Sequence, residues 1–177
     1  MRILVTAAAR YGSSSEIAER LGAALRVQLS GTRATVDVRR LDEVHGLDGY
    51  DAVILGSAVY MGRWTRSART FVAANADTLD TVPTWLFSCG SGDDIPTPAS
   101  RCADGERIRD MIGARDHRVF TGRLDAPRAY RRERLLAAMS HGRRVEDGTV
   151  ARVDTWAVSI AWQLSRLETS GDAAVAR

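Results

Sequence analysis

The sequence predicts an α/β protein with a parallel sheet covered by helices on both faces. Three mainly apolar runs carry this prediction, because such runs are typical of strands buried on both sides; they are Ile3–Val5, Ala52–Leu55 and Pro83–Cys89. Segments with helical spacing of apolar residues alternate with these runs, which implies right-handed crossovers between parallel strands. At 177 residues the chain is expected to form one domain over residues 1–168, followed by a disordered tail at 169–177.

Each further element has a local signal. The first helix is expected at 14–29, where apolar residues share one face, and it ends before Gly31, a plausible capping residue. The other expected elements are an edge strand at 35–38, where polar and apolar residues alternate, a connection at 41–50, a helix at 65–75, a helix ending near 112, a strand at 117–121, a short helix at 133–139 and a closing helix built on Val153, Trp156, Ile160 and Leu164.

The composition excludes several classes of function. The chain has a net charge of +3 and contains no lysine, which excludes a Walker A phosphate loop and Schiff-base chemistry. Cys89 and Cys102 make no disulfide framework, and three scattered histidines show no metal-ligand spacing. No membrane span, secretory signal or nucleic-acid-binding motif is visible, so a cytoplasmic protein with anionic partners is expected.

A turn rich in small and hydroxyl residues joins the first strand to the first helix. Ser13 and Glu16 have the spacing of a capping box, which fixes the first helical turn after Gly12. The free backbone N–H groups of that turn, with the hydroxyls of Ser14 and Ser15 pointing outward, suit a phosphate at the positive end of the helix dipole. Plain capping explains the same residues equally well, so both interpretations stay open at this point.

Three loops follow the carboxyl ends of predicted strands, at 8–14, 57–64 and 89–98. In a parallel sheet these ends meet at one edge, and ligands bind there at the point where the strand order reverses. All three loops are rich in Gly and Ser, and the second contains Tyr60 and Trp64. A phosphate cradle beside aromatic side chains indicates a planar, phosphorylated ligand.

The residues of these loops resemble the flavodoxin family. The resemblance lies in 6–18 and in Gly56–Trp64, of which the second is the more distinctive. The branch that looks most similar is the flavodoxin-domain group that includes the menaquinone-dependent protoporphyrinogen IX dehydrogenases. Phe120–Asp125 and the closing helix also resemble that branch.

The resemblance implies a flavodoxin-like three-layer sandwich, with five parallel strands in the order 2-1-3-4-5, that binds FMN. The phosphate would lie on the 9–14 turn, Tyr60 or Trp64 would flank the flavin ring, and the backbone of Gly62 would approach flavin N5. Tyr60 is preferred, because Trp64 can turn inward with the helix. No catalytic side chain and no metal ligand is assigned. The implied cofactor-binding residues are Ala9, Arg10, Tyr11, Gly12, Ser13, Ser14, Ser57, Ala58, Val59, Tyr60, Met61, Gly62, Cys89, Gly90, Ser91 and Gly92.

The sequence also departs from the family pattern. Ala8 and Ala9 stand where hydroxyl side chains are usual, so FMN would depend on backbone N–H groups and the remaining polar residues of the turn. The stretch 127–146 is shorter than the corresponding insertion of the protoporphyrinogen dehydrogenases. Its arginines, at 128–134, leave an anionic substrate or peripheral membrane association open.

Three functions therefore stay open. The first is an FMN-dependent oxidoreductase that transfers electrons between a reduced organic substrate, such as protoporphyrinogen IX, and a quinone or similar acceptor. The second is a flavodoxin-type electron carrier, against which the basic charge balance counts. The third is a flavin-free binding or regulatory module on the same fold.

Other conspicuous residues have ordinary explanations. Cys89, at a strand end, is expected to be a small buried hydrophobe rather than a reactive thiol. Asp93 and Asp94 are expected to cap their loop or face solvent. No role is assigned to the histidines, which are His45, His117 and His141.

Overall fold

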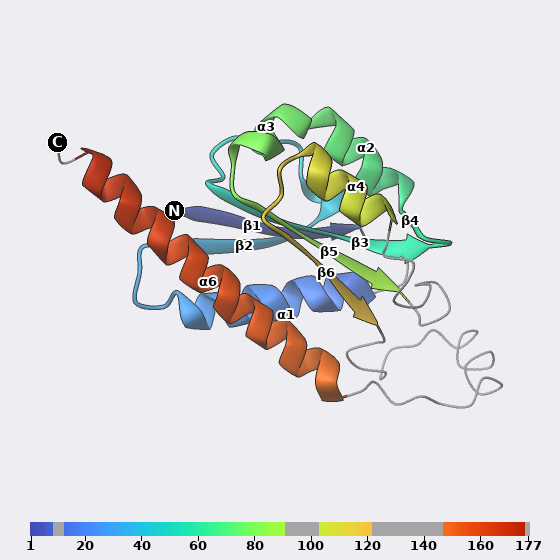
Figure 1. Ribbon diagram of the computed structural model, residues 1–177. Helices are drawn as coiled ribbons and strands as arrows, with labels where there is room; N and C mark the ends of the chain where they lie inside the picture. The colour runs from blue at the N-terminus through green and yellow to red at the C-terminus, as the bar shows by residue number, and fades with distance from the viewer. Residues whose placement is uncertain (9–12, 91–102, 122–146, 176–177) are drawn as a thin grey trace.

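The chain folds into a central sheet with helices on both sides (Figure 1). The computed structural model describes residues 1–8, 13–90, 103–121 and 147–175. In chain order the elements are β1 (Arg2–Ala8), α1 (Ser13–Gln28), β2 (Thr35–Arg40), the 3-10 helix η1 (Leu41–Glu43), β3 (Ala52–Tyr60), β4 (Arg63–Trp64), α2 (Arg66–Ala74), α3 (Ala76–Thr81), β5 (Thr84–Gly90), α4 (Ala103–Met111), β6 (Asp116–Thr121) and α6 (Asp147–Val175).

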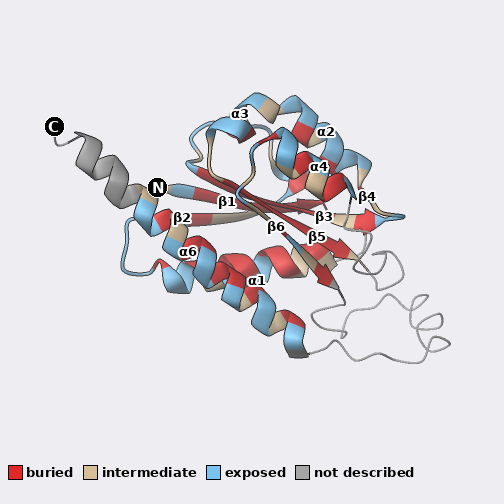
Figure 2. Cartoon of the chain, in the orientation of Figure 1, coloured by how far each residue is buried: buried red, intermediate tan, exposed pale blue. Residues whose placement is uncertain are grey.

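Five parallel strands form the sheet in the order β2-β1-β3-β5-β6, and the short β4 pairs antiparallel with the end of β3. Counted without β4, this is the predicted order 2-1-3-4-5, so the predicted α/β architecture is confirmed. β1, β3 and β5 are buried almost throughout (Figure 2). Their apolar runs therefore reflect burial on both faces, as expected for central parallel strands.

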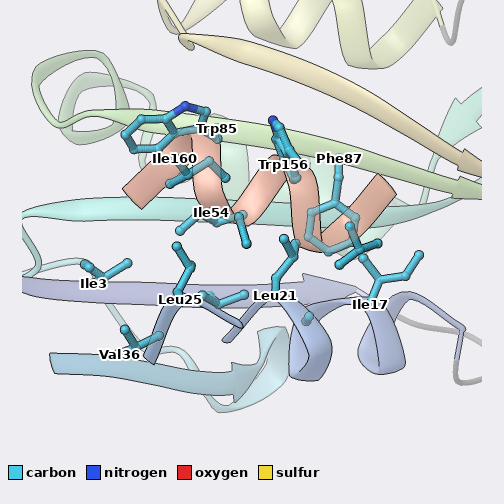
Figure 3. Packing of buried hydrophobic residues seen from close by; sticks show 14 of the residues in the cluster. Ile3, Ile17, Leu21, Leu25, Val36, Ile54, Trp85, Phe87, Trp156 and Ile160 are labelled. Carbon is cyan, nitrogen blue, oxygen red and sulfur yellow. The ribbon is translucent and has the colours of Figure 1, made fainter. Parts of the chain in front are cut away.

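One face of the sheet is covered by α1 and α6 (Figure 3). Ile17, Leu21 and Leu25, four residues apart on α1, pack with Trp156 and Ile160 of α6 against the sheet. Complete burial of each large aliphatic side chain contributes about 1.5–3 kcal/mol. This face supplies the larger of the two apolar clusters described.

The opposite face is covered by α2, α3 and α4. The hydroxyl of Thr65 accepts a hydrogen bond from the N–H of Ala68 at 3.3 Å and so caps α2. The helix ends where the side-chain amide of Asn75 donates to the carbonyl of Phe71 at 2.8 Å. The helix predicted at 65–75 is thus confirmed, and the short α3 follows it.

Some elements differ from the prediction or lie outside it. β4 was not expected, because two residues carry no periodicity. The short helix expected at 133–139 lies outside the described residues. α6 continues to Val175, so it includes most of the stretch expected as a tail at 169–177. Among the described residues, no helix combines the length and hydropathy needed to cross a bilayer.

Candidate functional site

The carboxyl ends of β1, β3 and β5 lie at the same edge of the sheet (Figure 1). The register pairs Ala8 with Ser57, and Ser57 with Ser88 on the far side of β3. Cys89 pairs in turn with Ala58. The three loops that the sequence places at strand ends therefore begin side by side, as predicted.

The end of β3 turns tightly into β4. Tyr60 pairs with Arg63 across the turn, and the two residues between them both have positive φ, 49° at Met61 and 75° at Gly62. Two left-handed residues in succession are the geometry of a type I′ hairpin turn, which Gly adopts without strain. A side-chain carbon at Gly62 would have no atom within 4 Å, so there is open space beside the Cα of Gly62.

The two aromatic side chains of this loop have opposite surroundings. Tyr60 is 61% exposed, whereas Trp64 is 2% exposed and packs into the cluster below α2 and α4. The expectation that Trp64 turns inward is confirmed. Tyr60, with the exposed Met61 beside it, is thus the aromatic residue that the turn presents to solvent.

The hydroxyl of Ser57 is used inside the protein. It donates to the carbonyl of Ala58 at 2.8 Å and accepts from the N–H of Thr65 at 3.1 Å. Ser57 is fully buried and Val59 nearly so. The side chains of Ser57 and Val59 therefore face the interior of the protein, which the sequence does not reveal.

The first turn of α1 contacts the end of β5. Ser14 is buried, so the expectation that its hydroxyl points outward is wrong. Burial raises the pKa of the Cys89 thiol to about 11, and the neighbouring Ser14 hydroxyl opposes the shift. Cys89 is therefore a protonated, buried thiol at neutral pH, which confirms its expected role as a small hydrophobe. Ser13 and Gly90 lie at the same edge, at the ends of α1 and β5.

Several predicted site residues lie outside the described residues. These are Ala9, Arg10, Tyr11 and Gly12 of the phosphate turn, Ser91 and Gly92 of the third loop, Asp93 and Asp94, and the arginines at 128–134. Their assignment stays a prediction.

Sequence reasoning missed a buried polar chain beneath the turn. Trp64, Ser88, His117 and Glu106 are linked by hydrogen bonds. They come from four separate elements, so no local spacing connects them. Trp64 and Ser88 lie near the ends of β4 and β5, whereas His117 is the second residue of β6 and Glu106 lies in α4.

The comparisons with known proteins agree with this fold. The sequence model of a family described as the flavodoxin domain matches residues 4–146. This chain belongs to that family. No curated protein matches the flavodoxin-domain chain in a sequence search.

Solved structures resemble the chain at low identity. A flavodoxin from the domain Archaea has 12% identity and a TM-score of 0.64, with 93% of this chain and 99% of that chain covered. A cysteine-to-serine mutant of flavodoxin from Pseudomonas aeruginosa has 13% identity and a TM-score of 0.63, with the same coverage. Rubredoxin oxygen:oxidoreductase from Desulfovibrio gigas has 13% identity and a TM-score of 0.62, and 93% of this chain covers 36% of that one. At these identities the likeness establishes the flavodoxin-like fold.

Proposed function

We propose that this chain is a cytoplasmic FMN-binding oxidoreductase that transfers electrons between a reduced organic substrate and a quinone or similar acceptor. The observation that carries the proposal is the positive-φ turn at Met61 and Gly62, which presents Tyr60 at the edge where β1, β3 and β5 end. The flavodoxin-domain match supports a flavin as the ligand.

The residues at this edge fit FMN. The first turn of α1, which begins at Ser13, lies at the positive end of the helix dipole and so suits the phosphate. The exposed ring of Tyr60 suits stacking on a flavin, and the open space beside the Cα of Gly62 suits close approach. When bound, FMN supplies the redox chemistry, and the protein tunes it by stacking, hydrogen bonds and charge.

The charge beside the turn favours an anionic substrate or acceptor. Arg63, which pairs with Tyr60, and Arg66, the first residue of α2, are both exposed, and the net charge of the chain is +3. Both guanidinium groups attract carboxylates or phosphates in solution. Protoporphyrinogen IX, with a menaquinone as acceptor, is the first pair to test, because Gly56–Trp64 resembles the branch that uses them.

Titration of FMN into the purified protein tests the proposal. FMN fluorescence should be quenched to saturation, and Tyr60→Ala should weaken binding by about tenfold through lost stacking. Trp162→Ala removes another exposed aromatic side chain, on α6 and outside the candidate site, and should leave the affinity unchanged. If FMN fluorescence does not change on titration, both redox functions are excluded and the flavin-free binding or regulatory module remains.

Turnover assays then separate the enzyme from an electron carrier. The FMN-loaded protein should oxidise protoporphyrinogen IX with menaquinone in repeated cycles. A carrier is the second candidate, favoured by the two flavodoxins that align over 93% of this chain. FMN binding without turnover, combined with electron exchange with a flavodoxin reductase, would establish the carrier instead.

A further inference from the structure

A buried chain of hydrogen bonds runs beneath the candidate site. The indole N–H of Trp64 donates to Oγ of Ser88 at 2.7 Å, and Oγ lies 2.8 Å from Nε2 of His117. Nδ1 of His117 lies 3.1 Å from Oε1 of Glu106. Trp64, Ser88 and His117 are all buried, so the chain is shielded from water over most of its length.

The chemistry of the groups fixes the direction of each bond. Burial lowers the pKa of His117 from 6.5, opposed by Glu106, so the imidazole is neutral at neutral pH. A carboxylate can only accept, which places the single ring proton on Nδ1. Nε2 is then an acceptor, so the Ser88 hydroxyl donates to it. All three bonds run from Trp64 towards Glu106.

Helix α4, which contains Glu106, also binds the backbone of Trp64. The backbone N–H of Trp64 donates to Oδ2 of Asp104 at 3.1 Å. Asp104 and Glu106 both lie in the first turn of α4, and a side-chain carbon at Gly105 between them would overlap the ring of His117. Trp64 is the last residue of β4. The start of α4 therefore holds the strand that closes the turn.

Ser88, His117 and Glu106 are connected like a nucleophile, base and acid of a hydrolase. Ser88 has no exposed surface, however, and its oxygen accepts the indole N–H. No substrate carbonyl can reach the Ser88 oxygen, so these hydrogen bonds are suited to holding Trp64 in place rather than to acyl transfer.

We propose that His117 is a positioning residue for the turn at Tyr60–Arg63, acting through Ser88 and Trp64, so that protonation of its imidazole weakens FMN binding. This rests on the proposed function. A proton added to Nε2 reverses the bond to Ser88, whose oxygen then accepts from both rings, and the hold on Trp64 changes.

The charged groups around His117 influence the pH at which its imidazole is protonated. Glu106 and Asp116 favour protonation, while burial and Arg109 oppose it. Glu106 and Arg109 come from α4, Asp116 precedes His117 on β6, and the β5 neighbour Ser88 is uncharged. The transition is therefore expected on the acid side of an ordinary histidine.

The first test uses the protein without flavin. The Trp64 indole N–H signal, assigned with Trp64→Phe, is followed by NMR from pH 5 to 8. It should shift in one step, and the step should disappear in His117→Gln, which keeps hydrogen-bonding groups but does not titrate. His45→Gln, at an exposed histidine, should keep it. A Trp64 signal that ignores pH, or a step that persists in His117→Gln, overturns the proposal.

The second test measures FMN affinity at both ends of that pH range. Acidification should weaken FMN binding to the wild type by about fivefold more than it weakens FMN binding to His117→Gln. This is about the effect of one buried hydrogen bond. Ser88→Ala should bind more weakly at both pH values, without the extra step. If FMN binds with the same pH response in both proteins, the positioning role is wrong and the proposed function stands. If FMN never binds, the proposed function and the positioning role both fail. The NMR titration then still shows whether His117 and Trp64 are connected through hydrogen bonds.

Discussion

Substitution of Gly56 by alanine provides the sharpest test of the packing. Gly56 lies in β3, and a side-chain carbon there would overlap the ring of Phe87 on β5. Phe87 cannot move freely, because its ring packs edge-on against Phe120 and Trp156, with centroids 6.3 and 6.4 Å away. The φ angle of Gly56 is not positive, so alanine brings no backbone strain and the overlap alone is tested.

The expected cost follows from these contacts. Overpacking of a filled core costs about 1–3 kcal/mol, and disturbance of the aromatic pairs adds about 0.5–1.5 kcal/mol. A total of about 2–4 kcal/mol should lower the Tm by about 4–16 °C for a chain of this size. Urea unfolding followed by circular dichroism measures the free energy directly.

Two controls identify the ring as the cause. Gly31→Ala places the same group in open space and should change stability by less than about 0.5 kcal/mol. In a Phe87→Leu background, Gly56→Ala should cost less than it does in the wild type, because the obstructing ring is gone. Equal unfolding midpoints for Gly56→Ala and Gly31→Ala would refute the packing argument.

The remaining predictions concern single side chains. Trp156→Ala should cost about 3–5 kcal/mol and Trp162→Ala less than about 0.5 kcal/mol in urea unfolding, because the first is 4% exposed and the second 60%; similar losses would contradict the burial. The guanidinium of Arg2 lowers the pKa of Asp37, so Arg2→Gln should reduce stability slightly at pH 7, and the difference should fade as the pH falls through that lowered pKa; a constant difference would count against the pair. With a pKa of about 11, Cys89 should react slowly with iodoacetamide at pH 8 in a variant lacking the other cysteine and quickly in urea; fast reaction of the folded protein would show an accessible thiol.

The sequence by itself determined the architecture. Continuous apolar runs in β1, β3 and β5, with helical periodicity between them, dictate a parallel sheet covered on both faces, and the strand order followed from the resemblance. It also placed the three loops at one edge, because parallel strands all end on the same side. Even the inward turn of Trp64 could be anticipated from its place just before the helix predicted at 65–75.

Only the tertiary structure decided which way individual side chains point. Whether Ser14 and Ser57 face a ligand or the interior depends on Cys89 and Thr65, which reach them from other elements. His117 shows the same limit most clearly, because its partners Ser88 and Glu106 lie on another strand and a helix. Periodicity along the chain records burial, which is averaged over many neighbours. A hydrogen bond depends on one particular neighbour, and folding alone brings that neighbour into place.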